Sequence, residues 1–174
     1  LKKEALLFLK SKKRSELLQK KEKAFKEKDV HGYLVADYKR LVENLKLSFK
    51  NQIIIKEEPY SCDIGKAVKE HIGELKKILE EDLLKTGGFY LSGGETPVLV
   101  KGNGLGGRNT EFVLRMILEL FFENVLNLSD TVLKKLAVAS FATDGTDGET
   151  SSAGAWFDYG AFLKAKKSGE NIKS

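Results

Sequence analysis

The stretch GNGLGGRN, residues 102–109, constrains the fold of this chain more than any other feature of its sequence. The strand-like run PVLVK precedes it, and the long apolar run TEFVLRMILELFF follows it with the character of a buried helix. Its first six residues also match the pattern G-x-G-x-x-G of dinucleotide-binding loops. Such a loop can hold a nicotinamide cofactor, hold another anion, or only turn the chain.

The spacing after the glycines does not fit the nicotinamide interpretation. A dinucleotide-binding loop needs an acidic residue at the tip of the next strand, about twenty residues further on. Here that distance ends at Phe121–Leu126, inside the predicted helix, and the next predicted strand ends only at Thr143. Free N–H groups and the helix dipole would still favour an anion, beside the planar guanidinium of Arg108. We therefore predict an anion site. The alternative is a tight turn in which Arg108 pairs with a surface carboxylate.

The residues around this loop also suggest how the helix begins. Asn109 is the predicted N-cap, and Glu111 falls in the first turn, where a negative charge is favoured. The helix is predicted to run from Thr110 to about Asn127 and to be mostly buried, with one polar line along it.

Two more glycine turns carry acidic or hydroxyl side chains. TDGTDG follows the apolar run Leu136–Ala142, which predicts a buried strand with parallel neighbours. Its aspartates, Asp144 and Asp147, lie where α/β folds place ligands, and either can bind Mg²⁺ or orient a hydroxyl. Hydrogen bonding within the turn is the alternative role for these side chains. The third turn, SGGET, carries Glu95 and two hydroxyl groups.

The rest of the chain alternates between short strand-like runs and amphipathic helices. A run at 32–36 precedes a helix in which Leu41, Val42 and Leu45 share a side, and QIIIKEE precedes a helix through KAVKEHIGELKKILEEDLL. FYLS and PVLVK predict two further strands, and SSAGAWFDYGAFLKAKKSG predicts a helix or a pair of turns. Together these elements predict an α/β fold of three layers, with a mostly parallel or mixed sheet and helices on both faces.

Composition places the chain among globular proteins, with 41% hydrophobic and 32% charged residues. No window approaches the roughly eighteen uninterrupted apolar residues of a membrane span. No signal peptide is recognisable, and the single cysteine, Cys62, cannot form an internal disulfide. We therefore expect a cytoplasmic protein with no membrane partner, in which Cys62 is a small buried side chain.

The net charge of +5 is unevenly distributed. Residues 1–50 hold 15 Lys and Arg against 7 Asp and Glu. The lysines of KKRSELLQKKEKAFKEKD alternate with glutamates at helical spacing, which is typical of a solvated helix face. Because the run lacks the aromatic interleaving of single-strand binders, we do not expect a nucleic acid partner. A nucleic-acid arm would show an affinity that falls steeply with salt.

SGGETPVLVKGNGLGGRNTEF and, about thirty residues later, ATDGTDGETSSAGA closely resemble the C-terminal MOFRL domain of the glycerate 2-kinase family, whose members are sometimes named hydroxypyruvate reductases. The resemblance covers residues 87–174, and a looser one covers Val30–Leu84. It implies a basic helical remnant of an N-terminal domain at 1–29, an α/β segment at 30–86, and an MOFRL-like domain at 87–174 that is incomplete at its C-terminus.

The resemblance implies ATP-dependent transfer of a phosphoryl group to a hydroxyl of D-glycerate, with Mg²⁺. It implies that Arg108 contacts the transferring phosphate or the glycerate carboxylate, and that Asp144 and Asp147 are metal or hydroxyl partners. These three residues are the catalytic candidates. The residues that it implies around substrate and phosphate are Ser92, Gly93, Gly94, Glu95, Gly104, Gly106, Gly107, Asn109 and Glu111.

Two departures from the family pattern bear on activity. The family has a large N-terminal domain with a further glycine-rich loop and a lysine, and neither is found in residues 1–86. The family also continues past a point like Ser174. We therefore expect a site in a cleft shared with that domain, and no activity from this chain alone. A hydroxypyruvate reductase and a non-catalytic module that binds an anion or a partner stay open as alternatives, and so does a homo-oligomer.

Overall fold

The computed structural model of the chain describes residues 37–49, 52–83, 87–99 and 104–169. The chain divides into a unit at Leu1–Asp37 and a unit at Tyr38–Ser174. The predicted helices at 1–29 and the predicted strand at 32–36 lie outside the described residues.

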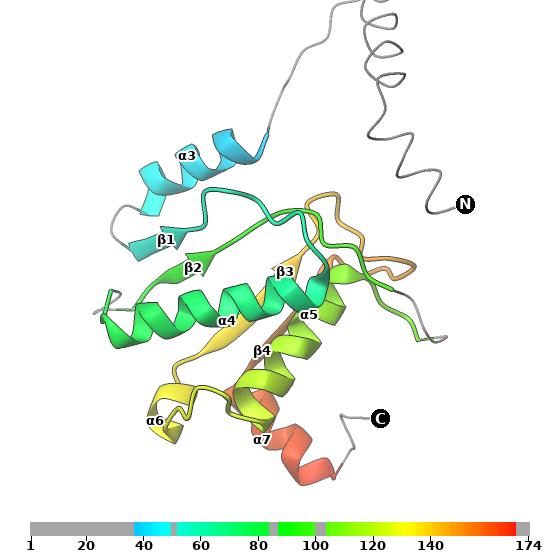
Figure 1. The fold of residues 1–174 in the computed structure, drawn as a ribbon. Helices are drawn as coiled ribbons and strands as arrows, with labels where there is room; N and C mark the ends of the chain where they lie inside the picture. The colour runs from blue at the N-terminus through cyan, green and yellow to red at the C-terminus, as the bar shows by residue number, and fades with distance from the viewer. Residues whose placement is uncertain (1–36, 50–51, 84–86, 100–103, 170–174) are drawn as a thin grey trace, which may run out of the picture. The chain divides into compact units, whose positions relative to one another are not determined.

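The second unit alternates helices and strands along the sequence, and the ribbon in Figure 1 shows their arrangement. In chain order the elements are α3 (Tyr38–Phe49), β1 (Ile53–Ile55), α4 (Ile64–Glu80), β2 (Phe89–Leu91), α5 (Arg108–Ile117), η2 (Leu118–Phe122), α6 (Asp130–Leu133), β3 (Ala137–Phe141), β4 (Gly154–Asp158) and α7 (Tyr159–Ser168). No helix among the described residues is long and apolar enough to cross a membrane.

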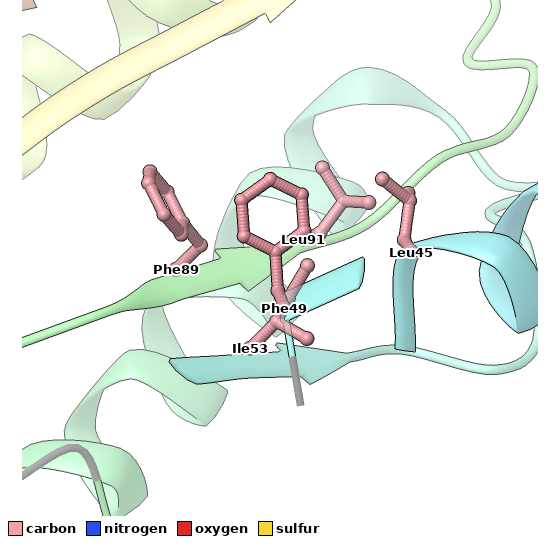
Figure 2. Close-up of a pocket in the computed structure, with 5 residues that line it drawn as sticks. All are labelled: Leu45, Phe49, Ile53, Phe89 and Leu91. Atoms are coloured by element: carbon pink, nitrogen blue, oxygen red, sulfur yellow. The ribbon is translucent and has the colours of Figure 1, made fainter. Parts of the chain in front are cut away.

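β1 and β2 pair in parallel over their whole length. Because successive side chains of a strand point to opposite faces, Phe89 and Leu91 face one side of this pair and Tyr90 the other. On the first side the pair meets α3 and leaves an apolar hollow of about 180 Å³ (Figure 2), lined by Leu45, Phe49, Ile53, Phe89 and Leu91. On the second side Tyr90 meets His71 of α4, with ring centroids 4.5 Å apart. Helices therefore cover both faces of this parallel pair.

The helix predicted through KAVKEHIGELKKILEEDLL is confirmed as α4. The Asp63 side chain caps it by accepting a hydrogen bond of 3.1 Å from the backbone N–H of Lys66. Apolar residues at helical spacing form its buried stripe, namely Ile64, Ala67, Val68 and Ile72. This stripe packs against α5 and forms the centre of the core. Cys62, just before the helix, is half-buried at the edge of the same core.

The helix after the glycine loop is buried, as predicted, but it is shorter and less regular than its sequence indicates. It begins as α5 at Arg108, widens into the π-helix η2 and ends at Phe122. Its buried face includes Met116, which is 1% exposed, and Leu120 and Phe121. The Phe121 ring contacts the ring of Phe157 in β4 at 5.4 Å. The helix thus joins the α4 layer to the second sheet.

The second sheet corrects two predictions. β3 confirms the strand predicted at Leu136–Ala142, but its partner β4 is antiparallel, and β3 is half exposed. In the sequence, small side chains such as that of Ala139 indicate a strand that is buried on both faces. In the structure Ala139 lies on the exposed face of β3. The segment predicted as a helix or a pair of turns contains the strand β4 as well as the helix α7. Aromatic residues favour the strand conformation of β4. Trp156 lies on the outer face of the pair and Phe157 on the inner face.

The predicted strand PVLVK is not observed over its described part. Residues 97–99 have no strand partner in the described structure, and Leu99 is 77% exposed. Pro97 has no backbone N–H to donate to a ladder. The remaining elements confirm the α/β class with mixed sheets, as two separate two-stranded pairs within the described ranges. β1 and β2, which pair, lie on either side of the predicted boundary at 86/87.

Candidate functional site

The SGGET turn leaves β2 and is bonded through its backbone to Tyr60, which follows β1. The Tyr60 N–H donates to the Gly93 carbonyl at 2.8 Å, and the Glu95 N–H donates to the Tyr60 carbonyl at 3.0 Å. Gly94 has φ +138°, and a Cβ there would collide with the Tyr60 backbone. A side chain at position 94 is therefore both strained and obstructed. Gly93 lies against the ring of Tyr38.

The glycine loop and the TDGTDG turn approach each other backbone to backbone. Gly107 is the N-cap position of α5, and a Cβ there would collide with the Asp147 carboxylate and with the Gly148 backbone. A Cβ at Gly148 would likewise collide with the Gly106 carbonyl, whereas Gly104 has open space around its Cα. The glycines at 107 and 148 thus allow a turn 38 residues away in sequence to reach the start of α5.

Asp147 caps α5 from that distant turn. Its Oδ1 accepts hydrogen bonds from the Asn109 backbone N–H at 3.0 Å and from the Asn109 amide at 3.1 Å. Its Oδ2 accepts from the Thr110 backbone N–H and from the Thr110 hydroxyl, both at 2.7 Å. Asp147 is only 2% exposed. Burial raises the pKa of this carboxyl, but the four hydrogen bonds outweigh burial and lower the pKa to about 2.

This arrangement corrects the prediction that Asn109 is the N-cap. The N-cap position is Gly107, which has no side chain to offer, and Asn109 lies inside the first turn. The Asn109 side chain bridges two partners, since its amide donates to Asp147 and its Oδ1 accepts from the Ser140 hydroxyl of β3 at 2.6 Å. Asp147 also occupies backbone N–H groups that were predicted to bind an external anion. The backbone N–H groups of Asn109 and Thr110 therefore already have an acceptor within the chain.

Arg108 is the exposed cation of the corner. Its guanidinium donates to the carboxylate of Glu95, and the two side chains are 46% and 85% exposed. This contact joins the SGGET turn to the start of α5, and it is the carboxylate pairing that the sequence left open as an alternative. Glu111 instead pairs with Arg115 one turn further along α5 at 2.7 Å, so its carboxylate supports the helix surface.

The two aspartates of TDGTDG have different surroundings. Asp144 is exposed and accepts a long hydrogen bond of 3.4 Å from the Thr146 backbone N–H, whereas Asp147 is buried in its cap. Among the described residues, no group of three or more His, Cys, Asp and Glu side chains is arranged to hold a metal ion.

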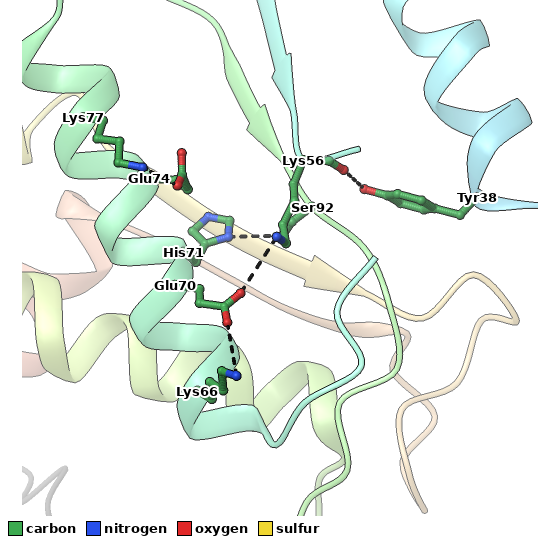
Figure 3. Close-up of polar contacts among 8 residues, drawn as sticks. All are labelled: Tyr38, Lys56, Lys66, Glu70, His71, Glu74, Lys77 and Ser92. Atoms are coloured by element: carbon green, nitrogen blue, oxygen red, sulfur yellow. Dashed lines mark hydrogen bonds and ion pairs between the residues drawn. The ribbon is translucent and has the colours of Figure 1, made fainter. Parts of the chain in front are cut away.

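His71 is a polar residue of this region that sequence reasoning did not assign to it. Its Nδ1 lies 3.1 Å from the Ser92 Oγ (Figure 3). Burial against Tyr90 and Phe112 lowers the pKa of His71 to about 4, so the ring is neutral near pH 7. One signal was present in the sequence, because position 71 lies next to Ile72 and one turn after Ala67 on the buried stripe of α4.

Residues 88–174, half of the chain, match the MOFRL family. The D-glycerate 2-kinase of Thermotoga maritima is 33% identical over 111 residues, which cover 63% of this chain and 24% of the relative. The glycerate 2-kinase of Picrophilus torridus is 44% identical over 70 residues, 40% of this chain and 14% of the relative. The glycerate kinase of Bos taurus is 40% identical over 84 residues, 48% of this chain and 15% of the relative. The chain thus spans between about a seventh and a quarter of these relatives.

The fold is also similar to a solved structure. The crystal structure of the PH0495 protein from Pyrococcus horikoshii OT3 matches with a TM-score of 0.54 and 26% sequence identity. The match covers 83% of this chain and 32% of that chain. Sequence and structure comparisons therefore agree that this arrangement of elements occurs as part of longer proteins.

Proposed function

This chain belongs to the MOFRL family, and from that premise we propose that it is part of an enzyme that phosphorylates D-glycerate with ATP. The observation that carries the proposal is the corner at which SGGET, the glycine loop and TDGTDG meet around Arg108. All three motifs of the family's pattern converge there, although about thirty residues of sequence separate the glycine loop from TDGTDG. The rest of the active site belongs, in this proposal, to other parts of a longer protein.

Arg108 is proposed to bind the anionic groups of the reactants. A guanidinium can form two parallel hydrogen bonds to a phosphate or a carboxylate, and its charge does not depend on pH in the physiological range. Phosphoryl transfer requires mainly positioning and neutralisation of charge on the transferred group. Glu95, which is highly exposed, holds the guanidinium in place and can be replaced by a substrate anion at small free-energy cost.

Asp147 is proposed to position Arg108 rather than to contact a reactant. Its carboxylate bonds the two residues that follow Arg108, and Asn109 connects the same point to Ser140 in β3. The first turn of α5 is thus fixed from two sides. Because the backbone of this turn is held in place, the Arg108 side chain has less freedom before a ligand binds. Less entropy is therefore lost on binding.

ATP and Mg²⁺ are part of this proposal as the phosphoryl donor and its usual counter-ion. The donor set of Asp147 does not fit a metal ligand, because both of its oxygens already accept two hydrogen bonds. Asp144 is exposed, and it is the carboxylate of this turn that we propose for an ion held together with the phosphates. Mg²⁺ when bound would neutralise phosphate charge; the described residues set no geometry for it.

The test is ADP release that depends on D-glycerate, measured on the full-length protein with Mg·ATP. Arg108→Ala is expected to lower kcat/KM by about a hundredfold or more, because it removes a charge-assisted contact to the reacting anions. Arg115→Ala is the matched control, since Arg115 is equally exposed on the same helix and is also paired with a carboxylate. Equal effects of the two substitutions would remove Arg108 from the site. Absence of glycerate-dependent ADP release in the wild type would refute the proposed reaction.

Two further measurements separate the alternatives. A hydroxypyruvate reductase would oxidise NAD(P)H, but the position expected for its acidic residue lies in η2 and the loop that follows, well before β3. A non-catalytic module would show heat of ATP binding in calorimetry with no turnover in the full-length protein.

A further inference from the structure

The SGGET turn is held at three points. Its backbone is bonded to Tyr60 on both sides of Gly94, and its Glu95 carboxylate is bonded to Arg108. At its start, Ser92 is bonded to His71 of α4. The histidine of this third contact comes from outside the three motifs that the sequence identifies, and neither the proposed function nor the family resemblance assigns His71 a role.

His71 reaches Ser92 from a fixed position. Its ring is tilted against Tyr90 with centroids 4.5 Å apart, and it meets Phe112 of α5 edge-on at 5.5 Å. Aromatic neighbours on two elements leave the imidazole little freedom to rotate. In either neutral tautomer Nδ1 can share one proton with the Ser92 hydroxyl, as acceptor or as donor. The imidazole therefore fixes the Ser92 rotamer and, with it, the first residue of the turn.

We infer that His71 is a positioning residue of the proposed kinase site, which acts through Ser92 to set where the SGGET turn holds the Glu95 partner of Arg108. The inference rests on the proposed function, because it assigns Arg108 the task of binding a reactant. Only Gly93 and Gly94 lie between Ser92 and Glu95, and the Tyr60 backbone clamps both sides of Gly94. A displacement at Ser92 is therefore passed to Glu95 instead of being absorbed by a long loop.

Four variants of the full-length protein test this inference. His71→Phe keeps an aromatic ring against Tyr90 but removes the bond to Ser92, and Ser92→Ala removes the other partner. Each is expected to lower kcat/KM for glycerate phosphorylation about tenfold, the size of one lost hydrogen bond. Because both break the same contact, the double variant should lose no more than the more affected single variant. His71→Asn, whose amide can replace Nδ1, should recover most of the activity.

The matched control is Lys69→Ala, an exposed position on the same helix. It is expected to leave kcat and KM unchanged. Losses that multiply in the double variant would show that His71 acts independently of Ser92, and they would overturn the inference. Failure of His71→Asn to recover activity beyond His71→Phe would overturn it as well.

A second readout separates failure of the inference from failure of the proposed reaction. The side-chain ¹⁵N resonance of Arg108 Nε is followed by NMR in the wild type, in His71→Phe and in Ser92→Ala. If the turn transmits a displacement, both variants shift this resonance and Lys69→Ala does not. An unchanged Arg108 resonance overturns the inference even where kinase activity is present. A shifted resonance supports the mechanical link even where glycerate-dependent ADP release is absent and the proposed reaction has failed.

Discussion

The carboxylate of Asp147 accepts four hydrogen bonds from two consecutive residues at the start of α5. A helix normally takes such an acceptor from its own N-cap side chain, but Gly107 occupies that position here. The glycine leaves room for the backbone of the TDGTDG turn, and the turn supplies the missing acceptor. Asp147 therefore joins the TDGTDG turn to the glycine loop and holds the backbone next to Arg108 in place.

Replacing Asp147 should therefore reduce stability. Asp147→Ala leaves backbone and side-chain donors of Asn109 and Thr110 unpaired in a buried place, which is expected to cost about 2–4 kcal/mol. Asp147→Asn keeps the shape but turns one acceptor into a donor, and it should cost less. Asp144→Ala, in the exposed part of the same turn, should change stability by less than about 0.5 kcal/mol. Urea denaturation measures all three, and equal costs at 144 and 147 would contradict the capping role.

The backbone at Gly94 gives a second prediction at the scale of one residue. Gly94→Ala forces a side chain into φ +138° and into the Tyr60 backbone, which is expected to cost about 2 kcal/mol or more. Gly104→Ala is the control, because open space surrounds Gly104 and its φ is not in the left-handed region. Thermal unfolding compares the two variants, and a neutral Gly94→Ala would mean that the turn can move away from Tyr60.

At the scale of single residues, the sequence predicts which residues lie in the site better than it predicts which residues they contact. The motifs placed Arg108, Glu95 and Asp147 in one region, and all three meet at the start of α5. The identity of each contact depends on how residues far apart in sequence dock, and a turn such as TDGTDG has the same composition whether it binds an ion or caps a helix. His71 was missed as a site residue because its bond to Ser92 depends on the packing of α4 against β2.

The elements that the sequence predicts well are those whose signal is local. α4 has a capping aspartate and an apolar stripe at helical spacing, and β1 has three consecutive isoleucines. The sequence predicts parallel neighbours for β3, which is wrong. The small residues of β3 do not alternate between apolar and polar, so the sequence does not distinguish a fully buried strand from one with an exposed face. The direction of pairing depends on β4, whose start at Gly154 follows a turn that no local pattern identifies as part of a hairpin.

The two sides of β4 should differ in stability. Phe157 points inward and contacts the Phe121 ring at 5.4 Å, so Phe157→Ala is expected to cost about 2–4 kcal/mol. The adjacent Trp156 points outward and is 66% exposed, so Trp156→Thr should cost less than about 1 kcal/mol. Denaturant midpoints of the two variants give the comparison. A larger cost at Trp156 would contradict the register in which Phe157 faces α5 and η2.

At the scale of the whole molecule, two buried titratable groups make stability depend on pH in separate windows. His71 has its pKa lowered by burial to about 4, so between an unfolded value near 6.5 and pH 4 the unfolded chain binds a proton that the folded chain does not. Stability therefore falls as the pH is lowered through that window. Asp147, with a folded pKa of about 2 against an unfolded value near 3.8, adds a second loss between pH 4 and pH 2.

Among the described residues, His71 accounts for the loss of stability between pH 6.5 and pH 4, and a substitution can remove it. Tyr60 and Tyr90 also lie close to Ser92 and His71, but burial raises the pKa of both phenols, so they stay neutral below pH 7. Glu70 and Glu74 are on the more exposed side of α4, where each pairs with a lysine. Lowering the pH from 7 to 4.5 should therefore cost the wild type up to about 3 kcal/mol of unfolding free energy. In His71→Phe the slope over this range should nearly vanish, although its stability at pH 7 differs from that of the wild type. Urea denaturation at several pH values measures the slope; an unchanged slope in His71→Phe would mean that His71 is solvated and charged in the folded protein.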